Sequence, residues 1–180
     1  RTEFDVWPIY FIHTLLEVGG LLDGGPGKKL TSTGKGLRFL DQDPAVQVWF
    51  LLETWWYHTN WLVAFTVSGL GDQLPPHFVY ATLDLLLSLP VERPLSFEDF
   101  ADGLLQRTGL KWRSPQQTRA RNSLHSGIKN MVVDILERFR AIEKQMADKH
   151  TGNVRYQTLH KITLTRLGKG LLQALAGNLY

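Results

Sequence analysis

The segment LTSTGKGL (residues 30–37) and the segment LTRLGKGL (residues 164–171) are near-copies that lie close to opposite ends of a 180-residue chain. Besides the leading Leu, the copies share Thr, Gly, Lys, Gly and Leu at equal positions. We interpret each copy as the end of a strand, a capping Thr and the start of a helix, because a threonine hydroxyl can accept a backbone N–H of the first helical turn. Thr31 and Thr165 are the predicted caps.

The residues that precede each copy are alike in kind. Apolar side chains recur every three or four residues over 4–18 and over 116–140, which predicts an amphipathic helix before each copy. Short apolar stretches around polar or Gly-rich tips then predict two-stranded ribbons over residues 21–30 and about 142–164. The order helix, ribbon, capped helix therefore occurs twice, and we expect the two ends to be related units.

The middle of the chain is its most apolar and aromatic part. Residues 45–69 include Trp49, Trp55, Trp56 and Trp61. A helix that is apolar on nearly every face must be surrounded by protein, so we predict a central core helix here. A base-stacking surface is the alternative, and it is disfavoured because no Lys or Arg lies between the aromatic residues.

Capping residues mark two further helix starts. Asp43 precedes Pro44, the pair expected at an N-cap and a first helical position. Ser96 is followed three residues later by Asp99, a capping-box-like start for a helix over residues 97–108.

The second half of the chain adds the remaining elements. A helix is predicted over residues 78–89 and is ended by Pro90. After the long helix, strands over residues 141–146 and 157–164 flank a tip at residues 148–153.

Composition is typical of a globular protein, with 43% hydrophobic and 21% charged residues. Without cysteine the chain has no disulfide or thiolate chemistry, which fits the cytoplasmic location that we expect. Residues 45–67 contain Gln47, Glu53 and His58, so a buried helix is predicted there and not a membrane span. The chain begins at Arg1 without a Met or a leader segment, so we expect either a processed protein or, in preference, a fragment of a longer one.

Catalytic and metal chemistry find little support in the sequence. The six histidines show no metal-ligand spacing, and no nucleophile motif surrounds a serine. The two Gly-Lys-Gly segments lack the spacing of a phosphate-binding loop. We therefore expect neither an enzyme nor a bound cofactor or metal.

Charge is divided unevenly along the chain. Residues 1–90 hold five Lys/Arg and nine Asp/Glu, a net charge of −4, whereas residues 91–180 hold 15 and eight, a net charge of +7. Residues 107–169 alone carry 14 Lys/Arg against four Asp/Glu, a net charge of +10. An anionic partner is expected for this basic segment, although the charge alone does not specify nucleic acid.

The second half resembles a known superfamily. The order helix, helix, long helix, strand, tip, strand and then Leu-Thr-x-x-Gly-x-x-Leu, carried by residues 78–177, is similar to winged helix-turn-helix proteins, particularly bacterial regulators whose wing runs into an "LTxxG" helix. Residues 4–40 match it only in part, because the two helices expected before the first long helix are absent or replaced. No subfamily is assigned.

The resemblance implies where nucleic acid would bind. In winged-helix proteins the third helix enters the major groove and the wing touches the adjacent backbone. Arg, Asn and Gln can pair with base edges, and Arg and Lys can neutralise phosphates. For any single residue a solvated polar side chain is the simpler explanation, but the cluster favours nucleic-acid binding. The candidate residues, carried over by position, are Gln117, Arg119, Arg121, Asn122, His125 and Lys129 on the outward face of the third helix, with Lys149 and Arg155 on the wing.

The sequence thus predicts a mainly α protein, with tandem winged-helix-like units and two small β-ribbons around the Trp-rich helix. Its predicted parts are a partial unit (residues 1–41), a Trp-rich connecting helix and loop (42–76) and a winged helix-turn-helix domain (77–180). Two functions remain open. One is duplex DNA binding, as in a transcriptional regulator or a larger DNA-processing protein. The other is protein binding, through the acidic and aromatic-rich first half.

Overall fold

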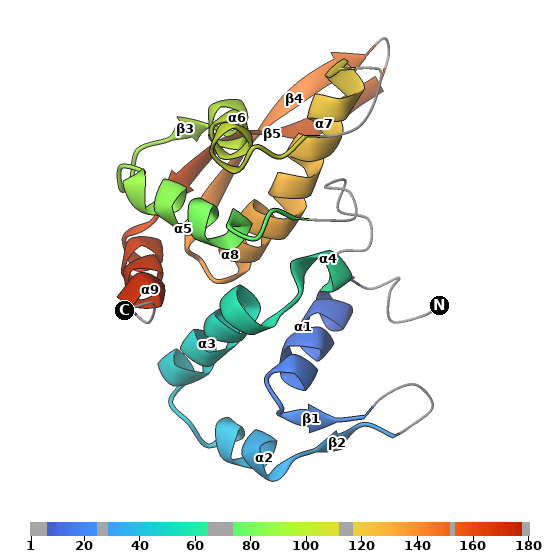
Figure 1. Cartoon of the computed structure of the whole chain (residues 1–180), viewed down its shortest axis with the longest axis vertical. Helices are drawn as coiled ribbons and strands as arrows, with labels where there is room; N and C mark the ends of the chain where they lie inside the picture. The colour runs from blue at the N-terminus through green and yellow to red at the C-terminus, as the bar shows by residue number, and fades with distance from the viewer. Residues whose placement is uncertain (1–6, 25–28, 65–73, 112–116, 152–153, 178–180) are drawn as a thin grey trace. The chain divides into compact units, whose positions relative to one another are not determined.

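The computed structural model is mainly helical and contains two small antiparallel sheets (Figure 1). The chain divides into two compact units, Arg1–Ala64 and Phe65–Tyr180, called the first and the second unit below. The structure describes residues 7–24, 29–64, 74–111, 117–151 and 154–177. Parts of several predicted features lie outside the described residues: the first helix at 4–6, the two tips at 25–27 and 152–153, the linker at 69–73 and the start of the long helix at 116.

The first unit consists of helices and one minimal ribbon. The strands β1 and β2 pair antiparallel, with Leu22 opposite Ser32. In chain order the elements are α1 (Trp7–Val18), β1 (Leu22–Asp23), β2 (Thr31–Ser32), α2 (Gly34–Leu40), α3 (Pro44–Glu53), the π-helical turn η2 (Thr54–His58) and α4 (Trp61–Ala64).

The second unit packs helices around a three-stranded antiparallel sheet with the strand order β3-β5-β4. Its elements are α5 (Phe78–Ser88), β3 (Leu95–Ser96), α6 (Phe97–Thr108), α7 (Gln117–Ile128), the π-helical turn η3 (Lys129–Val133), α8 (Asp134–Arg138), β4 (Ile142–Thr151), β5 (Val154–Leu164) and α9 (Arg166–Gly177).

Three of the predicted helix starts are confirmed by their caps. The Asp43 carboxylate accepts the N–H of Ala45 at 2.7 Å, with Pro44 at the start of α3. The Ser96 hydroxyl accepts a first-turn N–H of α6, and Thr165 caps α9. Each cap satisfies a backbone donor that has no partner within its own helix.

The capped helix of the first unit begins two residues later than predicted. Thr31 lies in β2, and Thr33 is the N-cap of α2. The Thr33 hydroxyl accepts the N–H of Gly36 at 2.9 Å, just as the Thr165 hydroxyl accepts the N–H of Gly168 at 2.8 Å. The prediction of Thr31 as a cap is therefore wrong. The element that the two units share in structure is Thr-x-x-Gly, which is Thr33 to Gly36 in the first unit and Thr165 to Gly168 in the second. Aligning the two sequence copies pairs Thr31 with Thr165 instead, two residues away from the structural match.

The two joints between helix and ribbon use the same hydrogen bonds. Each helix is followed by a left-handed residue two positions after its end, Gly20 with φ 69° or Arg140 with φ 54°. The N–H of the next residue, Leu21 or Ala141, donates to a carbonyl five residues earlier at 2.8 or 2.9 Å. The carbonyl of that same residue accepts the N–H of the capping threonine at 3.0 or 3.1 Å. The same backbone joint thus occurs once in each unit.

Each joint also brings a helix into direct contact with the residue that precedes a strand. An ideal Cβ on Gly36 would lie 2.1 Å from the Leu21 carbonyl oxygen, and one on Gly168 would lie 2.0 Å from that of Ala141. Real Cβ atoms do not approach an oxygen so closely, so only glycine fits at the third helical position of either joint.

The Trp-rich segment is interrupted. The prediction of one continuous helix over residues 45–69 is wrong, because α3 passes into a π-helical turn and the chain leaves the helix at residues 59 and 60 before α4. Thr59 closes the turn, since its N–H and its hydroxyl both donate to the Thr54 carbonyl, at 2.9 and 3.0 Å.

The aromatic side chains of this segment nevertheless form the core of the first unit. Trp55 and Trp56 are both buried. Trp61 stacks on Trp55 with ring centroids 5.2 Å apart, meets Trp56 edge-on at 5.3 Å and donates its indole N–H to the Trp55 carbonyl at 2.8 Å. Phe11 of α1 closes the cluster, 5.4 Å from Trp55.

The long helix of the second unit contains a π-helical turn between α7 and α8. The N–H of Asp134 donates to the carbonyl of Lys129, one residue further back than in an α-helix. The helix α6 packs against both α5 and α7. The buried side chains of the core include Leu83, Leu86, Phe100, Leu104, Ile128 and Ile135.

The sheet of the second unit extends beyond its predicted limits. Residues 148–151 were expected in the tip but belong to β4, which pairs with β5 as far as Thr151 opposite Val154. The strand β3 was not predicted. Its two residues, Leu95 and Ser96, form the sheet edge next to β5.

Candidate nucleic-acid interface

The candidate residues lie on two elements of the second unit, the long helix and the β4–β5 ribbon. Gln117 and Arg119 belong to α7, but their side chains lie outside the described part of the structure, so their roles stay predictions. The structure places the other six side chains: Arg121, Asn122 and His125 in α7, Lys129 in η3, Lys149 in β4 and Arg155 in β5.

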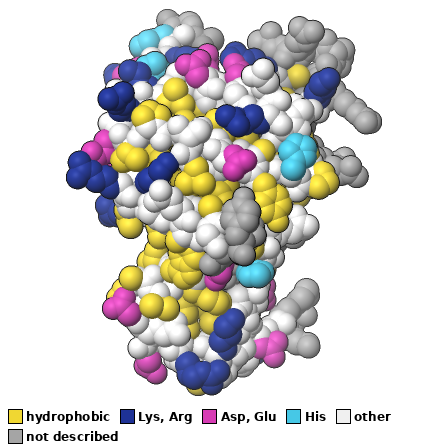
Figure 2. Space-filling model, turned by 60° about the vertical axis from the view of Figure 1, so that its left-hand side comes forward, with side chains coloured by type: hydrophobic (Ala, Val, Ile, Leu, Met, Phe, Trp, Pro, Cys, Tyr) yellow, Lys and Arg dark blue, Asp and Glu magenta, His cyan; other side chains and the backbone are white. Residues whose placement is uncertain are grey.

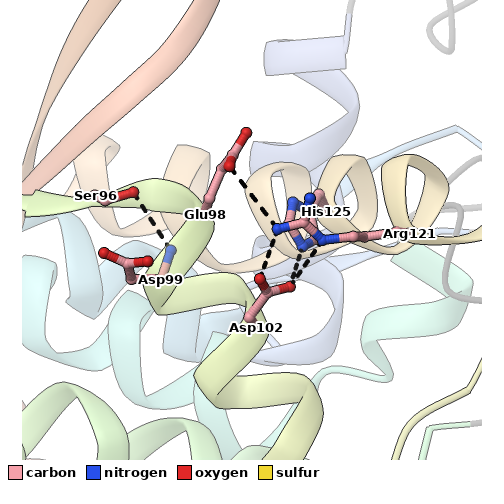
Figure 3. Close-up of polar contacts among 6 residues, drawn as sticks. All are labelled: Ser96, Glu98, Asp99, Asp102, Arg121 and His125. Atoms are coloured by element: carbon pink, nitrogen blue, oxygen red, sulfur yellow. Dashed lines mark hydrogen bonds and ion pairs between the residues drawn. The ribbon is translucent and has the colours of Figure 1, made fainter. Parts of the chain in front are cut away.

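Arg121 is turned toward α6 and paired with an acid (Figure 3). Its Nε and one terminal nitrogen donate to the two carboxylate oxygens of Asp102, at 3.2 and 2.6 Å. A carboxylate oxygen of Glu98 lies 3.8 Å from the same terminal nitrogen. This two-point contact joins α7 to α6, so replacing Arg121 would remove a contact within the unit as well as any contact to nucleic acid.

His125 was predicted to lie on the outward face of the helix, and this prediction is wrong. The side chain is buried, with 9% of its surface exposed. Its Nε2 lies 2.8 Å from Asp102, and its ring meets Phe97 edge-on at a centroid distance of 5.9 Å. His125 and Arg121 are four residues apart on one helical face, and that face packs against α6. The sequence alone indicated a polar helical face but not that α6 covers this part of it.

Asp102 therefore accepts hydrogen bonds from two side chains of α7. The hydrogen bonds from Arg121 hold the pKa of the Asp102 carboxyl below its ordinary value, although burial acts to raise it, and the bond with His125 lowers it further. The same pairing raises the pKa of Arg121. A carboxyl whose pKa is lower in the folded state stabilises that state above its unfolded pKa, and this stabilisation is lost as the pH falls through the folded pKa.

The Asp102→Asn variant is expected to unfold more easily than wild type at pH 7, by up to about 1 kcal/mol because the pair is partly exposed. The difference in free energy of unfolding should shrink as the pH falls below the ordinary pKa of an aspartate and toward the lower pKa of the folded state, because the unfolded wild-type chain then binds a proton that the folded chain does not. Urea titrations of both proteins at a series of pH values from 7 downward measure this difference in free energy of unfolding. A difference that does not change with pH would show that the charge of Asp102 does not stabilise the contact between α6 and α7.

Lys129 is also engaged within the unit. Its ammonium group lies 2.6 Å from Asp134, whose other carboxylate oxygen accepts from Lys144 at 2.8 Å. Burial acts to lower the pKa of Lys144, but its hydrogen bonds to Asp134 and Glu137 outweigh burial, and the pKa is raised. This group of charges joins the π-helical turn to α8 and β4.

The wing residues lie near the far end of the β4–β5 ribbon. Lys149 pairs with Tyr156 and His150 pairs with Arg155 across the two strands, so the pairs lie on opposite faces of the ribbon. Arg155 makes an ion pair with Asp148 at 2.6 Å on its own face. All five side chains are exposed, and within the described residues no acidic side chain lies within ion-pair distance of Lys149.

Most of the basic candidates are therefore held by acids of the same unit. Arg121, Lys129 and Arg155 each have an acidic partner, whereas Asn122 and Lys149 are exposed without one among the described residues. On the face that Figure 2 shows, Lys and Arg side chains are scattered among acidic and hydrophobic ones. This arrangement favours contacts to an anionic partner through single cations, and it does not form a continuous basic surface among the described residues.

Two kinds of site residue were not found from the sequence. Glu98 and Asp102 are spaced four residues apart on α6 and match the spacing of Arg121 and His125 on α7. This match indicates an ion pair only once α6 and α7 are known to pack together. Tyr156 lies opposite Lys149 because of a register shift after Gln145, which no local pattern predicts.

Within the described residues no group of His, Asp and Glu side chains could hold a metal ion. Among the described helices none combines the length and the apolarity needed to cross a bilayer. The sequence matches no protein-family model, and neither a curated protein nor a solved structure matches the chain.

Proposed function

We propose that the second unit is a winged-helix module that binds duplex DNA, as part of a transcriptional regulator or of a larger DNA-processing protein. Two features support the winged-helix assignment. The elements follow the order helix, strand, helix, long helix, two-stranded ribbon, helix, and the short strand β3 pairs with the second strand of the ribbon. In this assignment α7, η3 and α8 form the third helix and the β4–β5 ribbon forms the wing.

The observation that carries the proposal is the far end of the ribbon. Two antiparallel strands of ten and eleven residues present Lys149 on one face, and His150 and Arg155 on the other. Lys149 has no acidic partner among the described residues, so its charge is available to a phosphate. Phosphate contacts of this kind position a protein on duplex DNA and supply much of its affinity.

The third helix contributes less to the proposed contact than its composition suggests. Arg121 and His125 are already bonded to Asp102. Among the described side chains of α7, this leaves Asn122 as the exposed candidate that Asp102 does not engage. Gln117 and Arg119, one turn earlier, are the proposed partners of base edges. Binding that depends mainly on the wing should discriminate weakly between DNA sequences.

Lys149→Ala is expected to weaken duplex binding about equally for all sequences and to reduce the slope of log affinity against log salt by about one unit, because one fewer counterion is released. Fluorescence anisotropy with a labelled duplex over a salt series measures both quantities. Arg166→Ala is the matched control, since it also removes one positive charge but at the start of α9, beside Glu92. Equal effects of the two variants, or no salt-dependent binding by wild type, would contradict the proposal.

Protein binding remains the second candidate function, because the first unit exposes several large apolar side chains. Ile9 and Ile12 of α1, Leu37 and Leu40 of α2, and Val46 and Val48 of α3 are all exposed. Contiguous apolar surfaces are rare on monomers, so a surface that brings several of these side chains together would mark a binding site for a partner.

A further inference from the structure

The equivalence of the two joints allows positions of α2 and α9 to be compared residue by residue. Thr33 and Thr165 cap the two helices in the same way, so the fourth helical position is Leu37 in α2 and Lys169 in α9. The seventh position is Leu40 in α2 and Leu172 in α9. Both positions lie on one helical face, because they are three residues apart.

In the second unit this face is covered by a helix. Lys169 reaches the end of α5, where its ammonium group donates to the Leu87 carbonyl, and α5 packs against α9 (Figure 1). Leu172 is completely buried, with 0% of its surface exposed. The helix that covers it has its own apolar face, with Leu83 and Leu86 buried three residues apart.

In the first unit the equivalent face is open. Leu37 is 58% exposed and Leu40 is 70% exposed. The opposite side of α2 is packed within the unit. Gly36 contacts the Leu21 carbonyl, and Phe39 packs against Phe50 of α3 with ring centroids 5.5 Å apart. α2 therefore exposes two leucines at the positions that, in α9, lie on the face packed against α5.

We propose that the face of α2 formed by Leu37 and Leu40 is a docking site for an amphipathic helix of a partner protein, which packs on it as α5 packs on α9. Leu37 replaces the lysine that bonds the end of α5, so the contact in the first unit is wholly apolar. Asp41 is exposed directly after Leu40 and four residues from Leu37, so it lies beside this face, and charge complementarity favours a partner helix whose apolar stripe is flanked by Lys or Arg. The proposal is independent of DNA binding by the second unit.

A labelled peptide of residues 77–90, extended by lysines at both ends, is a suitable probe because it carries the apolar spacing of α5. Anisotropy with the full chain should show saturable binding, and Leu40→Asp should weaken it at least about tenfold, or about 1.4 kcal/mol. Leu167→Asp is the matched control, since Leu167 is also an exposed leucine, with 56% of its surface accessible, at the second position of α9. It should leave peptide binding unchanged. A peptide with Asp at both Leu83 and Leu86 should not bind.

Several results would overturn the proposal. One is the absence of saturable binding to the full chain, and another is equal weakening by Leu40→Asp and Leu167→Asp. Sedimentation velocity of the full chain without peptide gives the third: a dimer that Leu40→Asp abolishes would show that a second copy covers the face. Circular dichroism melts of each variant check that the fold is kept, as expected for substitutions at exposed positions.

Discussion

Trp55→Ala is expected to lower the free energy of unfolding of the first unit by about 3–5 kcal/mol, enough to unfold a marginally stable unit. Trp55 has 0% of its surface exposed and lies between Phe11 of α1 and Trp61. Truncation would remove both ring contacts and leave a cavity next to the π-helical turn. Because the indole of Trp61 donates to the Trp55 carbonyl, displacement of Trp61 would also weaken the end of that turn.

Urea or thermal unfolding followed by tryptophan fluorescence and circular dichroism measures the loss. Tyr80→Ala is a suitable control, since it also truncates an aromatic residue but one that is 51% exposed, and it should cost less than about 1 kcal/mol. Trp56→Ala should be nearly as damaging as Trp55→Ala, because Trp56 is also buried. If both Trp variants unfolded like the control, the aromatic cluster would not be the core of this unit.

Gly168→Ala is expected to destabilise the second unit by about 1–3 kcal/mol or more, although alanine is the better helix former. An added Cβ would lie 2.0 Å from the Ala141 carbonyl oxygen, a backbone atom that also accepts the N–H of Thr165. To make room, α9 must move away from the end of the long helix. That movement would weaken the cap and the packing of Leu172 together.

Gly170→Ala supplies the matched control, two residues further along α9, where a Cβ would meet nothing within 4 Å. It should stabilise the unit by up to about 1 kcal/mol, since alanine costs less backbone entropy than glycine in a helix. Chemical denaturation of the two variants gives the difference directly. Stabilisation by both substitutions would mean that α9 and the strand end do not approach as closely as described.

The features that follow from local chemistry could be predicted from the sequence. Asp43, Ser96 and Thr165 cap helices as expected, because a cap needs only a side-chain oxygen and the first turn of its own helix. Gly109 ends α6 in the left-handed conformation for an equally local reason. The apolar periodicities likewise placed most helices within a few residues.

Parts of the candidate site could not be predicted, because each depends on a partner distant in the sequence. The burial of His125 requires Asp102 of α6, and the orientation of Arg121 requires the same carboxylate. The two faces of the wing depend on the register between β4 and β5, which shifts after Gln145. A polar side chain on a helix can face solvent or a neighbouring helix, and the sequence of its own helix does not distinguish the two.

The repeated segment shows the division between sequence and tertiary structure most clearly. The sequence by itself determined that a ribbon leads into a threonine-capped helix near each end, since caps and turns are short-range. Only the tertiary structure decided that Thr33 and not Thr31 is the first cap. The glycine three residues after the cap must contact the carbonyl that precedes the strand. Gly36 contacts that of Leu21, whereas a Cβ on Gly34 would approach only the flexible end of Arg38. That contact joins residues fifteen positions apart, so no local pattern contains it.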